Sequence, residues 1–406
     1  MEHTARPEPM SVLSQAALLI MAACAATSVA NVYYVQPLLD VVAQEFSISN
    51  AAVGGVITAT QAGCALALLF VVPLGDLLNR KVLLCAELAL LAFVLLVISV
   101  SSSPLLLLIG MAGLGLLGTA VTQGIIAYAA TLSTPSERGR IIGTIQSGVL
   151  VGVLGARSLS GIVADIAGWR AVFVVSAGLA AVMLMVFVRS LPRLSLAPVK
   201  LRYSQLLASM FDLLASERVL QVRGVLGMMI FAAFGAFWSA LVLPLRAEPY
   251  QLSHTAIGAF GFVGIAGALA AARAGRLADR GLGERTTFLA LLCMVVAWAP
   301  IALLPHSLVV LCVGIVLLDL GGQAVHVINQ SMIFKTRPEM HSRLVGCYML
   351  FYAAGLGLGA IAATYTFSHA GWAGVCWLGL GISVSALIFW ALTRNALTPA
   401  VARAAP

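Results

Sequence analysis

The stretch RAVFVVSAGLAAVMLMVFVR, residues 170–189, carries no charged side chain between its two terminal arginines. A helix needs about 20 apolar residues to cross a bilayer, so this stretch has the length of one membrane span. Because the run is continuous and does not alternate with polar residues, it predicts a helix and not a barrel strand. Similar runs begin near residues 14, 51, 82, 104, 141, 170, 222, 254, 286, 307, 343 and 372. The sequence therefore predicts an all-α polytopic membrane protein with twelve transmembrane helices.

Composition and charge agree with a membrane protein. Of the 406 residues, 61% are hydrophobic and only 9% are charged, whereas soluble domains contain about 25% charged residues. Most of the 23 lysines and arginines lie in the termini and in alternate loops, so the net charge of +8 follows membrane topology and does not indicate a nucleic-acid partner. The positive-inside rule then predicts that both termini are cytoplasmic. The seven cysteines lie singly within the runs, which indicates neither a disulfide nor a metal site.

The two halves of the chain are related by an offset of 203 residues. This offset places Asp76 on Asp279, and Gly168–Trp169 on Gly371–Trp372, without a gap. Asp and Trp are scarce in this sequence, so such matches are hard to obtain by chance. Each half holds six predicted spans, and an even number brings both halves into the membrane from the same side. The sequence therefore predicts two parallel six-helix repeats related by an axis along the membrane normal.

The repeat predicts three regions. Residues 1–189 and 222–406 form the two six-helix halves, and residues 190–221 form a cytoplasmic linker. Within the linker, residues 203–216 carry apolar side chains at helical spacing. This segment is either a short helix on the inner membrane surface or a plain connection.

Charged motifs follow the second and eighth predicted spans. They read VPLGDLLNRK (72–81) and GRLADRGLGER (275–285). Together with the two six-span halves and the basic linker, they resemble the major facilitator superfamily (MFS), whose signature loop reads G-x-L-A-D-R-x-G-R-[KR]. The resemblance covers nearly the whole chain and implies the MFS fold.

Shorter motifs resemble the drug:proton antiporter-like branch of bacterial exporters within that family. They are NVYYVQPLL (31–39), PSERGR (135–140), GWR (168–170) and RPEMHSR (337–343). Two stretches differ from the branch. Residues 152–161 carry Arg157 where the branch usually has a Gly-Pro motif, and residues 110–115 read GMAGLG, without the arginine usual in the fourth span.

The resemblance also implies where and how the protein works. A small-molecule transporter of the bacterial cytoplasmic (inner) membrane is expected, acting as a monomer without a cofactor and moving substrate by alternating access. The charged motifs would close a cytoplasmic gate through contacts between helix ends. Anchoring of topology would explain the basic residues of these motifs but not the repeated aspartate. The implied gate residues are Asp76, Arg80, Lys81, Asp279 and Arg280.

A stripe of polar residues, DLGGQAVHVINQ (319–330), interrupts the tenth predicted span. On a helix, Asp319, Gln323, His326 and Gln330 lie within an arc of roughly 60°, and Asn329 lies to one side. A central Asp costs about 3 kcal/mol on insertion scales, so this face lines either a water-filled cavity or a polar contact between helices. The resemblance places this span against the central cavity. We therefore expect Asp319, assisted by His326, to couple transport to protons.

Further polar side chains are candidates for contact with substrate. The offset maps His326 onto Gln123 of the fourth span, at the same depth. Arg157 lies deep in the fifth span, where a buried cation requires an acidic partner or an anionic ligand. Asp319 and Asp165 are both possible partners. The complete predicted set is Asn31, Tyr34, Gln36, Gln61, Gln123, Arg157, Trp238, Gln323, Asn329 and Gln330.

Two side chains, one of them in this set, also have ordinary structural explanations. Trp238 belongs to an aromatic stripe of the seventh span, which serves either packing or an aromatic substrate. Glu87, near the inner end of the third span, is expected to be part of a structural ion pair.

Three functions are consistent with these residues. The leading hypothesis is proton-coupled export of a small amphipathic molecule. The second is uptake or exchange of an organic anion that binds Arg157, and the third is a sensor with the same fold that transports nothing. An enzyme is not expected, because the sequence shows no nucleophile–base pair, no H-E-x-x-H and no phosphate-binding loop.

Overall fold

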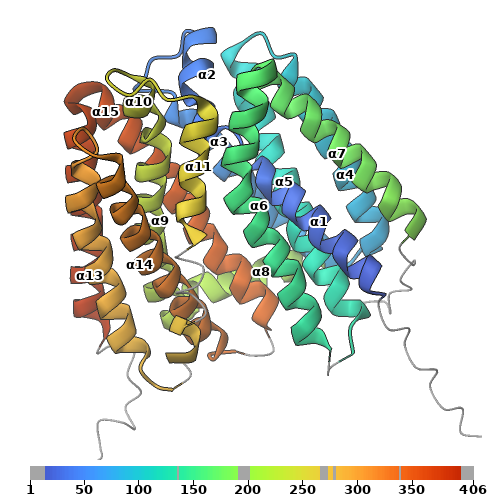
Figure 1. Ribbon diagram of the computed structural model, residues 1–406. Coiled ribbons are helices and arrows are strands. Elements are labelled where there is room, and N and C mark those ends of the chain that lie inside the picture. The colour runs from blue at the N-terminus through green and yellow to red at the C-terminus, as the bar shows by residue number, and fades with distance from the viewer. Residues whose placement is uncertain are drawn as a thin grey trace, which may run out of the picture.

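The computed structural model describes residues 14–134, 137–190, 202–265, 273–277, 280–337 and 340–394, and these residues form helices and no strand (Figure 1). The predicted all-α fold class is confirmed. The first-half helices are α1 (Gln15–Asn31), α2 (Leu39–Glu45), α3 (Gly54–Leu66), α4 (Arg80–Ser99), α5 (Pro104–Leu132), α6 (Arg138–Ala167) and α7 (Trp169–Ser190). The second-half helices are α9 (Arg218–Ala240), α10 (Val242–Arg246), α11 (His254–Val263), α13 (Gly283–Ala302), α14 (Leu308–Phe334) and α15 (His341–Thr393).

Within the described residues, ten helices are long and apolar enough to cross a membrane. One of them belongs to α15, whose 53 residues would extend about 80 Å as a straight helix. Its path breaks at Gly371, where φ is 61° and ψ is −160°, so α15 consists of two helical segments. Helix α11 is shorter and is followed by residues outside the described part. The number twelve therefore stays a prediction.

The repeat is visible in the backbone at one pair of glycines. Gly168 separates α6 from α7 with φ of 82°, and its counterpart Gly371 breaks α15 with φ of 61°. A positive φ is readily adopted by glycine and is unfavourable for residues with a Cβ. The tight turn between the last two helices thus has the same cause in each half.

Helix starts follow local chemistry. The side chains of Ser14, Ser103, Ser253 and Ser307 accept a hydrogen bond from a backbone N–H in the first turn of α1, α5, α11 and α14. Such caps satisfy donors that a helix start otherwise leaves unpaired. Many large apolar side chains face outward, among them Ile166, Val309 and Leu392. Lipid-facing helices require such a surface, whereas soluble proteins rarely expose so much apolar area.

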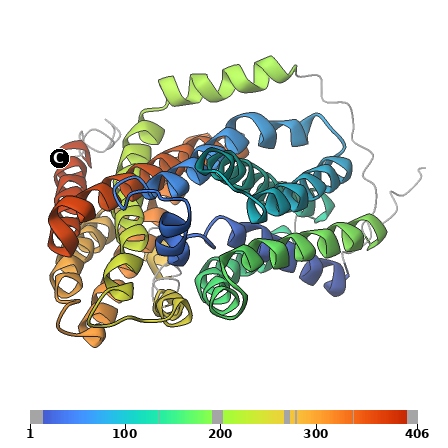
Figure 2. The same ribbon diagram turned by 90° about the horizontal axis from the view of Figure 1, so that it is seen from above.

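The first-half and second-half helices meet along two seams. Helix α6 packs against α11, and α3 packs against α15, as Figure 1 shows for α6 and α11 near its upper edge. Between the halves, residues 203–216 form helix α8 (Tyr203–Ser216), which lies crosswise near the lower end of the bundle in Figure 1 and along its outer edge in Figure 2. The helical reading of this segment is confirmed. We call this end of the molecule the α8 end, and the opposite end, which carries α2 and α10, the α2 end.

Candidate functional site

A cavity of about 450 Å³ lies between the two halves, with walls from α1, α3, α5, α6, α9, α14 and α15. This volume lies within the usual range of ligand pockets, about 300–1,000 Å³. Its apolar lining includes Phe231, Met349 and Val153, which suits a ligand with an apolar body. Five predicted substrate or coupling residues line this central cavity: Gln61, Gln123, Gln323, His326 and Gln330.

His326 is held by neighbours from two other helices. Its Nδ1 lies 3.0 Å from the hydroxyl of Tyr348, and its ring meets the ring of Phe231 edge-on at 5.0 Å between centroids. An imidazole can donate or accept at either nitrogen according to its tautomer. The central cavity thus has one oriented group that can exchange a proton with substrate or water.

A smaller cavity of about 70 Å³ contains the two charged residues that the sequence singled out. Arg157 on α6 and Asp319 on α14 both line it, as do Gln36 and Trp238. Both charged side chains are buried. Within the described part of the chain, no ion pair of 4 Å or less joins them. We call this space the charge chamber.

Arg157 is oriented by one hydrogen bond and two aromatic rings. Its Nε donates to Oε1 of Gln36 at 2.8 Å, and its guanidinium carbon lies 4.1 Å from the Trp238 ring centroid and 5.4 Å from that of Tyr33. Cation–π contact offsets part of the penalty for burying the charge. The hydroxyl of Tyr33 lies 2.7 Å from that of Tyr352 and joins α1's end to α15.

Gly264 gives Asp319 room in the charge chamber. A Cβ at position 264 would lie 2.4 Å from Oδ2 of Asp319, which is too close for any larger residue unless the carboxylate moves. Since Arg157 and Asp319 face one cavity, ionisation of Asp319 leaves the chamber neutral overall, whereas its protonation leaves one uncompensated cation. The chamber can therefore respond to a proton or to an anion.

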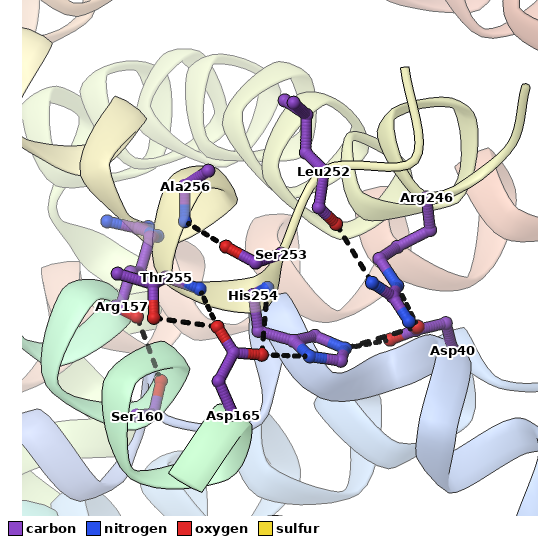
Figure 3. A network of polar contacts seen from close by, with 10 residues as sticks. All are labelled: Asp40, Arg157, Ser160, Asp165, Arg246, Leu252, Ser253, His254, Thr255 and Ala256. Carbon is purple, nitrogen blue, oxygen red and sulfur yellow. Dashed lines mark hydrogen bonds and ion pairs between the residues drawn. The ribbon is translucent and has the colours of Figure 1, made fainter. Parts of the chain in front are cut away.

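A group of charged residues connects the halves at the α2 end (Figure 3). His254, at the start of α11, has Nδ1 3.0 Å from Oδ1 of Asp165 and Nε2 3.1 Å from Oδ1 of Asp40. Arg246 donates from Nε to Oδ2 of Asp40 at 2.9 Å. Thr255 donates its backbone N–H at 2.8 Å and its hydroxyl at 2.7 Å to Oδ2 of Asp165. We call these five residues the closure cluster.

The closure cluster joins two first-half carboxylates to second-half donors. Asp40 lies on α2 and Asp165 on α6, whereas Arg246 and His254 belong to α10 and α11. Hydrogen bonds with a charged partner are about twice as strong as neutral ones. A neutral imidazole has one N–H, whereas a protonated imidazole has two. His254 can therefore donate to both carboxylates, Asp40 and Asp165, only when it is protonated. These contacts hold the two halves together at the α2 end.

Glycines bring α6 and α11 into close contact beside the closure cluster. A Cβ at Gly161 would lie 2.3 Å from the carbonyl oxygen of His254, and one at Gly258 would lie 2.3 Å from that of Arg157. On the other seam, the hydroxyl of Thr58 donates to the carbonyl of Gly357 at 2.7 Å. Backbones can approach this closely only where side chains are absent. The α2 end is therefore closed.

Replacing Asp165 by Asn is expected to loosen this closure by roughly fivefold. The change keeps the shape of the side chain but removes one charge, and the loss of a charge-assisted bond is worth about 1 kcal/mol at this partly exposed position. The readout is the labelling rate of the cysteine introduced by Ser158→Cys in the buried crossing of α6 and α11, in a background whose seven native cysteines are replaced by alanine. Asp212→Asn on the exposed side of α8 is the matched control. Equal labelling rates in the two variants would show that Asp165 does not hold the closure.

The structure corrects several predicted positions. Asp165 is not the partner of Arg157, because it binds His254 and Thr255. Asn31 bonds to the carbonyl of Thr27 and the hydroxyl of Ser176, so it lies in the packing between α1 and α7.

Two more predicted substrate residues lie away from both cavities. Tyr34 is buried inside the first half. Asn329 is fully buried and donates to the carbonyl of Arg223, because its direction on α14 points toward α9. In this arrangement of the halves, these two residues and Asn31 pack inside the protein, and their contact with substrate stays a prediction.

The predicted cytoplasmic gate stays a prediction. Arg80 donates to the carbonyls of Gly75 and Ala127 and to Thr131, and Lys81 donates to the carbonyl of Val188. These contacts remain within the first half. Arg280 is exposed, and the predicted roles of Asp76 and Asp279 lie outside what the structure describes of these side chains.

Sequence reasoning missed the second-half members of the closure cluster and one ion pair with a buried arginine. His254 follows a helix cap, and Arg246 ends a short helix, so neither belongs to a periodic stripe. Arg223 on α9, with a side chain only 1% exposed, pairs with Glu284 on α13. The apolar run around Arg223 gave no signal for this pairing.

Comparisons with known proteins agree with this architecture. The sequence profile of the Major Facilitator Superfamily matches residues 18–228 and 224–406. The chain is 39% identical over 383 residues to the "Uncharacterized transporter YgaY" of Escherichia coli O157:H7, covering 94% of this chain and 97% of that protein. It is 30% identical over 392 residues to the "Probable transporter SCO4007" of Streptomyces coelicolor, covering 93% and 89%.

A solved structure has the same fold. It is a bacterial homologue of the human lysosomal transporter Spinster, in an inward-facing and occupied conformation, with a TM-score of 0.78 over 97% of this chain and 100% of that one. The sequence identity is 14%, so this likeness concerns the fold alone. The chain belongs to the Major Facilitator Superfamily, and it is a multi-pass membrane transporter and not an enzyme.

Proposed function

We propose that the protein is a secondary active transporter of the drug:proton antiporter-like branch, which exports a small amphipathic molecule in exchange for protons. The observation that carries this proposal is the charge chamber. Asp319 is a buried carboxyl group at the junction of the two halves and lines the charge chamber together with Arg157. The charge chamber shares the wall residue Gln323 with the central cavity. Buried ionisable groups within membrane spans are costly and typically mark ion pathways.

The orientation of the molecule in the membrane is part of this proposal. The positive-inside rule makes the α8 end cytoplasmic in a bacterial inner membrane, so the closure cluster faces the outside and the structure corresponds to an inward-facing state. Parallel repeats of this kind alternate access by rocking of one half against the other around a central site. The closure cluster and the glycine crossing of α6 and α11 would separate in the outward-facing state.

Proton coupling follows from the charge chamber. When Asp319 is ionised, it balances Arg157 across the cavity. Protonation removes the buried negative charge and thereby changes which arrangement of the halves is the more stable. In an exchange cycle, Asp319 would release its proton toward the cytoplasm, and substrate would then bind in the central cavity. After rocking, a proton from outside would neutralise Asp319 and favour release of substrate. His326 would assist by relaying protons within the central cavity.

The charge of the substrate decides the sign of coupling. A cationic substrate would compete with the proton for Asp319, which produces exchange in opposite directions. An anionic substrate would bind Arg157 best when Asp319 is protonated, which moves the anion and the proton in the same direction. Acidification should therefore weaken binding of a coupled cation and strengthen binding of a coupled anion.

The position of Arg157 supports the second candidate function, uptake or exchange of an organic anion. Only its Nε donates to a described side chain, whereas the side chain as a whole lines the charge chamber. Under this function, Arg157→Gln is expected to weaken binding of the anion by roughly 150- to 4,000-fold, since breaking a buried charge pair costs about 3–5 kcal/mol. Isothermal titration measures the loss, and Arg157→Lys, which keeps the charge, should retain part of the affinity. Binding of the anion that survives in Arg157→Gln would exclude this function.

Reconstituted liposomes test the exporter directly. A substrate is first identified by a thermal-shift screen of compound classes on the purified protein. Addition of that substrate to liposomes containing the protein and a pH-sensitive dye should then move protons in the direction opposite to the substrate. Transport without any proton movement would contradict the proposal. No cofactor or second subunit enters this cycle, so we propose that a monomer suffices.

A further inference from the structure

A second large cavity lies at the α8 end, outside the transport site described above. Its volume is about 460 Å³, and its walls come from α4, α5, the segment after α3, α8 and the start of α15. It shares the lining residues Leu68 and Gln123 with the central cavity, so the two spaces adjoin. We call it the side chamber.

The side chamber contains a buried carboxyl group without a partner. Glu87 lies seven residues into α4, which places it about 10 Å from the helix start. Its side chain lines the side chamber, yet the residue is only 5% exposed, and its Oε2 is buried without a hydrogen-bond partner. The ion pair expected for Glu87 is absent from the described residues. A buried polar atom left unpaired is destabilising, and this unpaired oxygen faces a cavity, which points to a ligand as the missing partner.

The backbone beside Glu87 supplies an independent observation. Helix α3 ends at Leu66 and continues as a π-helical turn, Ala67–Val71, and then as a 3-10 segment, Val72–Asp76. Residues from both irregular segments line the side chamber. Irregular backbone at membrane depth is tolerated where it lines a cavity, and π-helical turns occur frequently at functional sites. The second span is thus distorted at the side chamber.

Of the three arginines that line the side chamber, one has hydrogen-bond partners of its own and two are partly or fully exposed. Arg80 uses Nε and Nη1 to bind backbone carbonyls and Thr131. Arg138 is exposed, and Arg343 is half-buried near the start of α15. Water strongly reduces the electrostatic interaction of an exposed charge with other charges, whereas a buried charge interacts more strongly. Glu87 lies in an apolar part of the wall, where a Cβ at Gly124 would lie 2.8 Å from Cδ2 of Leu84 and 3.6 Å from Oε2 of Glu87, so the field there is dominated by Glu87.

We propose that the side chamber is a binding site for a monovalent organic cation with an apolar body, whose charge lies against Glu87. The apolar walls accommodate the body, and the carboxylate supplies the counter-charge. Because the side chamber adjoins the central cavity, a cation bound there stands on the route from the α8 end to the transport site. Binding at Glu87 requires neither a gradient nor Asp319.

Equilibrium dialysis of the purified full-length protein tests this site. The probes are tetraphenylphosphonium and its uncharged relative triphenylphosphine oxide, and the variants are Glu87→Gln and Asp319→Asn. Glu87→Gln is expected to weaken phosphonium binding about tenfold and to leave binding of the oxide unchanged. Asp319→Asn should keep the Glu87-dependent binding, which separates this site from the proposed coupling. Phosphonium binding in Glu87→Gln equal to that of the wild type would overturn the proposal, as would an equal loss for both probes.

A filled side chamber provides a second test that leaves Glu87 intact. Ala127→Leu adds volume to the wall of the side chamber without changing any charge. It should reduce phosphonium binding about tenfold at an unchanged melting temperature. Undiminished binding in this variant would contradict the location, even if Glu87→Gln fails to fold.

Discussion

Replacing Asp319 by Asn is expected to abolish substrate-driven proton movement while substrate still binds. Asparagine keeps the shape of the side chain beside Gly264 but cannot ionise, so the charge chamber loses its response to protons. We expect substrate-dependent proton flux to fall by on the order of 100-fold, equivalent to about 2.7 kcal/mol. The flux is measured in proteoliposomes with an internal pH-sensitive dye. Exchange of labelled substrate across the same membranes, without a gradient, should persist.

The matched control for Asp319→Asn is Asp212→Asn, which removes a carboxylate from the exposed side of α8. This control should couple like the wild type. If Asp319→Asn also couples like the wild type, the proton is carried elsewhere. His326, which lines the central cavity beside Tyr348, would then be the next residue to replace.

Replacing Gly258 by Leu is expected to hold the α2 end open and to stop transport. A Cβ at this position would lie 2.3 Å from the carbonyl oxygen of Arg157 and 2.8 Å from the Cα of Ser158, so α6 and α11 must separate. Overpacking of this kind is destabilising by about 1–3 kcal/mol, which shifts the balance from closed to open roughly 5- to 150-fold. The labelling rate of Ser158→Cys should rise by the same factor.

Gly155 supplies the control for steric bulk on the same helix. It lies two residues before Arg157 on α6, and a Cβ there would meet nothing within 4 Å. Gly155→Leu should therefore leave both labelling and transport unchanged. Normal transport by Gly258→Leu would mean that the tight crossing of α6 and α11 is not needed in the cycle.

Much of the fold follows from the sequence because the membrane makes simple demands. Each span needs a continuous apolar run, and each such run in the chain corresponds to helical structure wherever the residues are described. The repeat pairs Gly168 with Gly371, and the two glycines form equivalent turns because both have a positive φ. The division of α15 into two helical segments was likewise expected from separate runs that begin near residues 343 and 372.

The candidate site was only partly predictable. The period of α14 predicted that Gln323, His326 and Gln330 share a face, and these three residues line one cavity. The positions of Asn31 and Asn329 were harder to predict, because a polar residue within a span can form its hydrogen bonds either by packing inside one half or in a cavity. The closure cluster lay beyond sequence reasoning. Its first-half carboxylates and their second-half partners lie about 90 or more residues apart, and no pattern along the chain indicates which helix ends meet.

The central claim is that the closed α2 end must open in every transport cycle. Spin labels at Ile166→Cys and Glu248→Cys, which occupy exposed positions on the two halves at that end, report this motion. Double electron–electron resonance measures the distance between the two labels. We predict a short distance for the closed arrangement, together with a second and longer distance whose population changes with substrate and pH. A single unchanged distance, under conditions in which the same labelled protein transports substrate, would contradict the account.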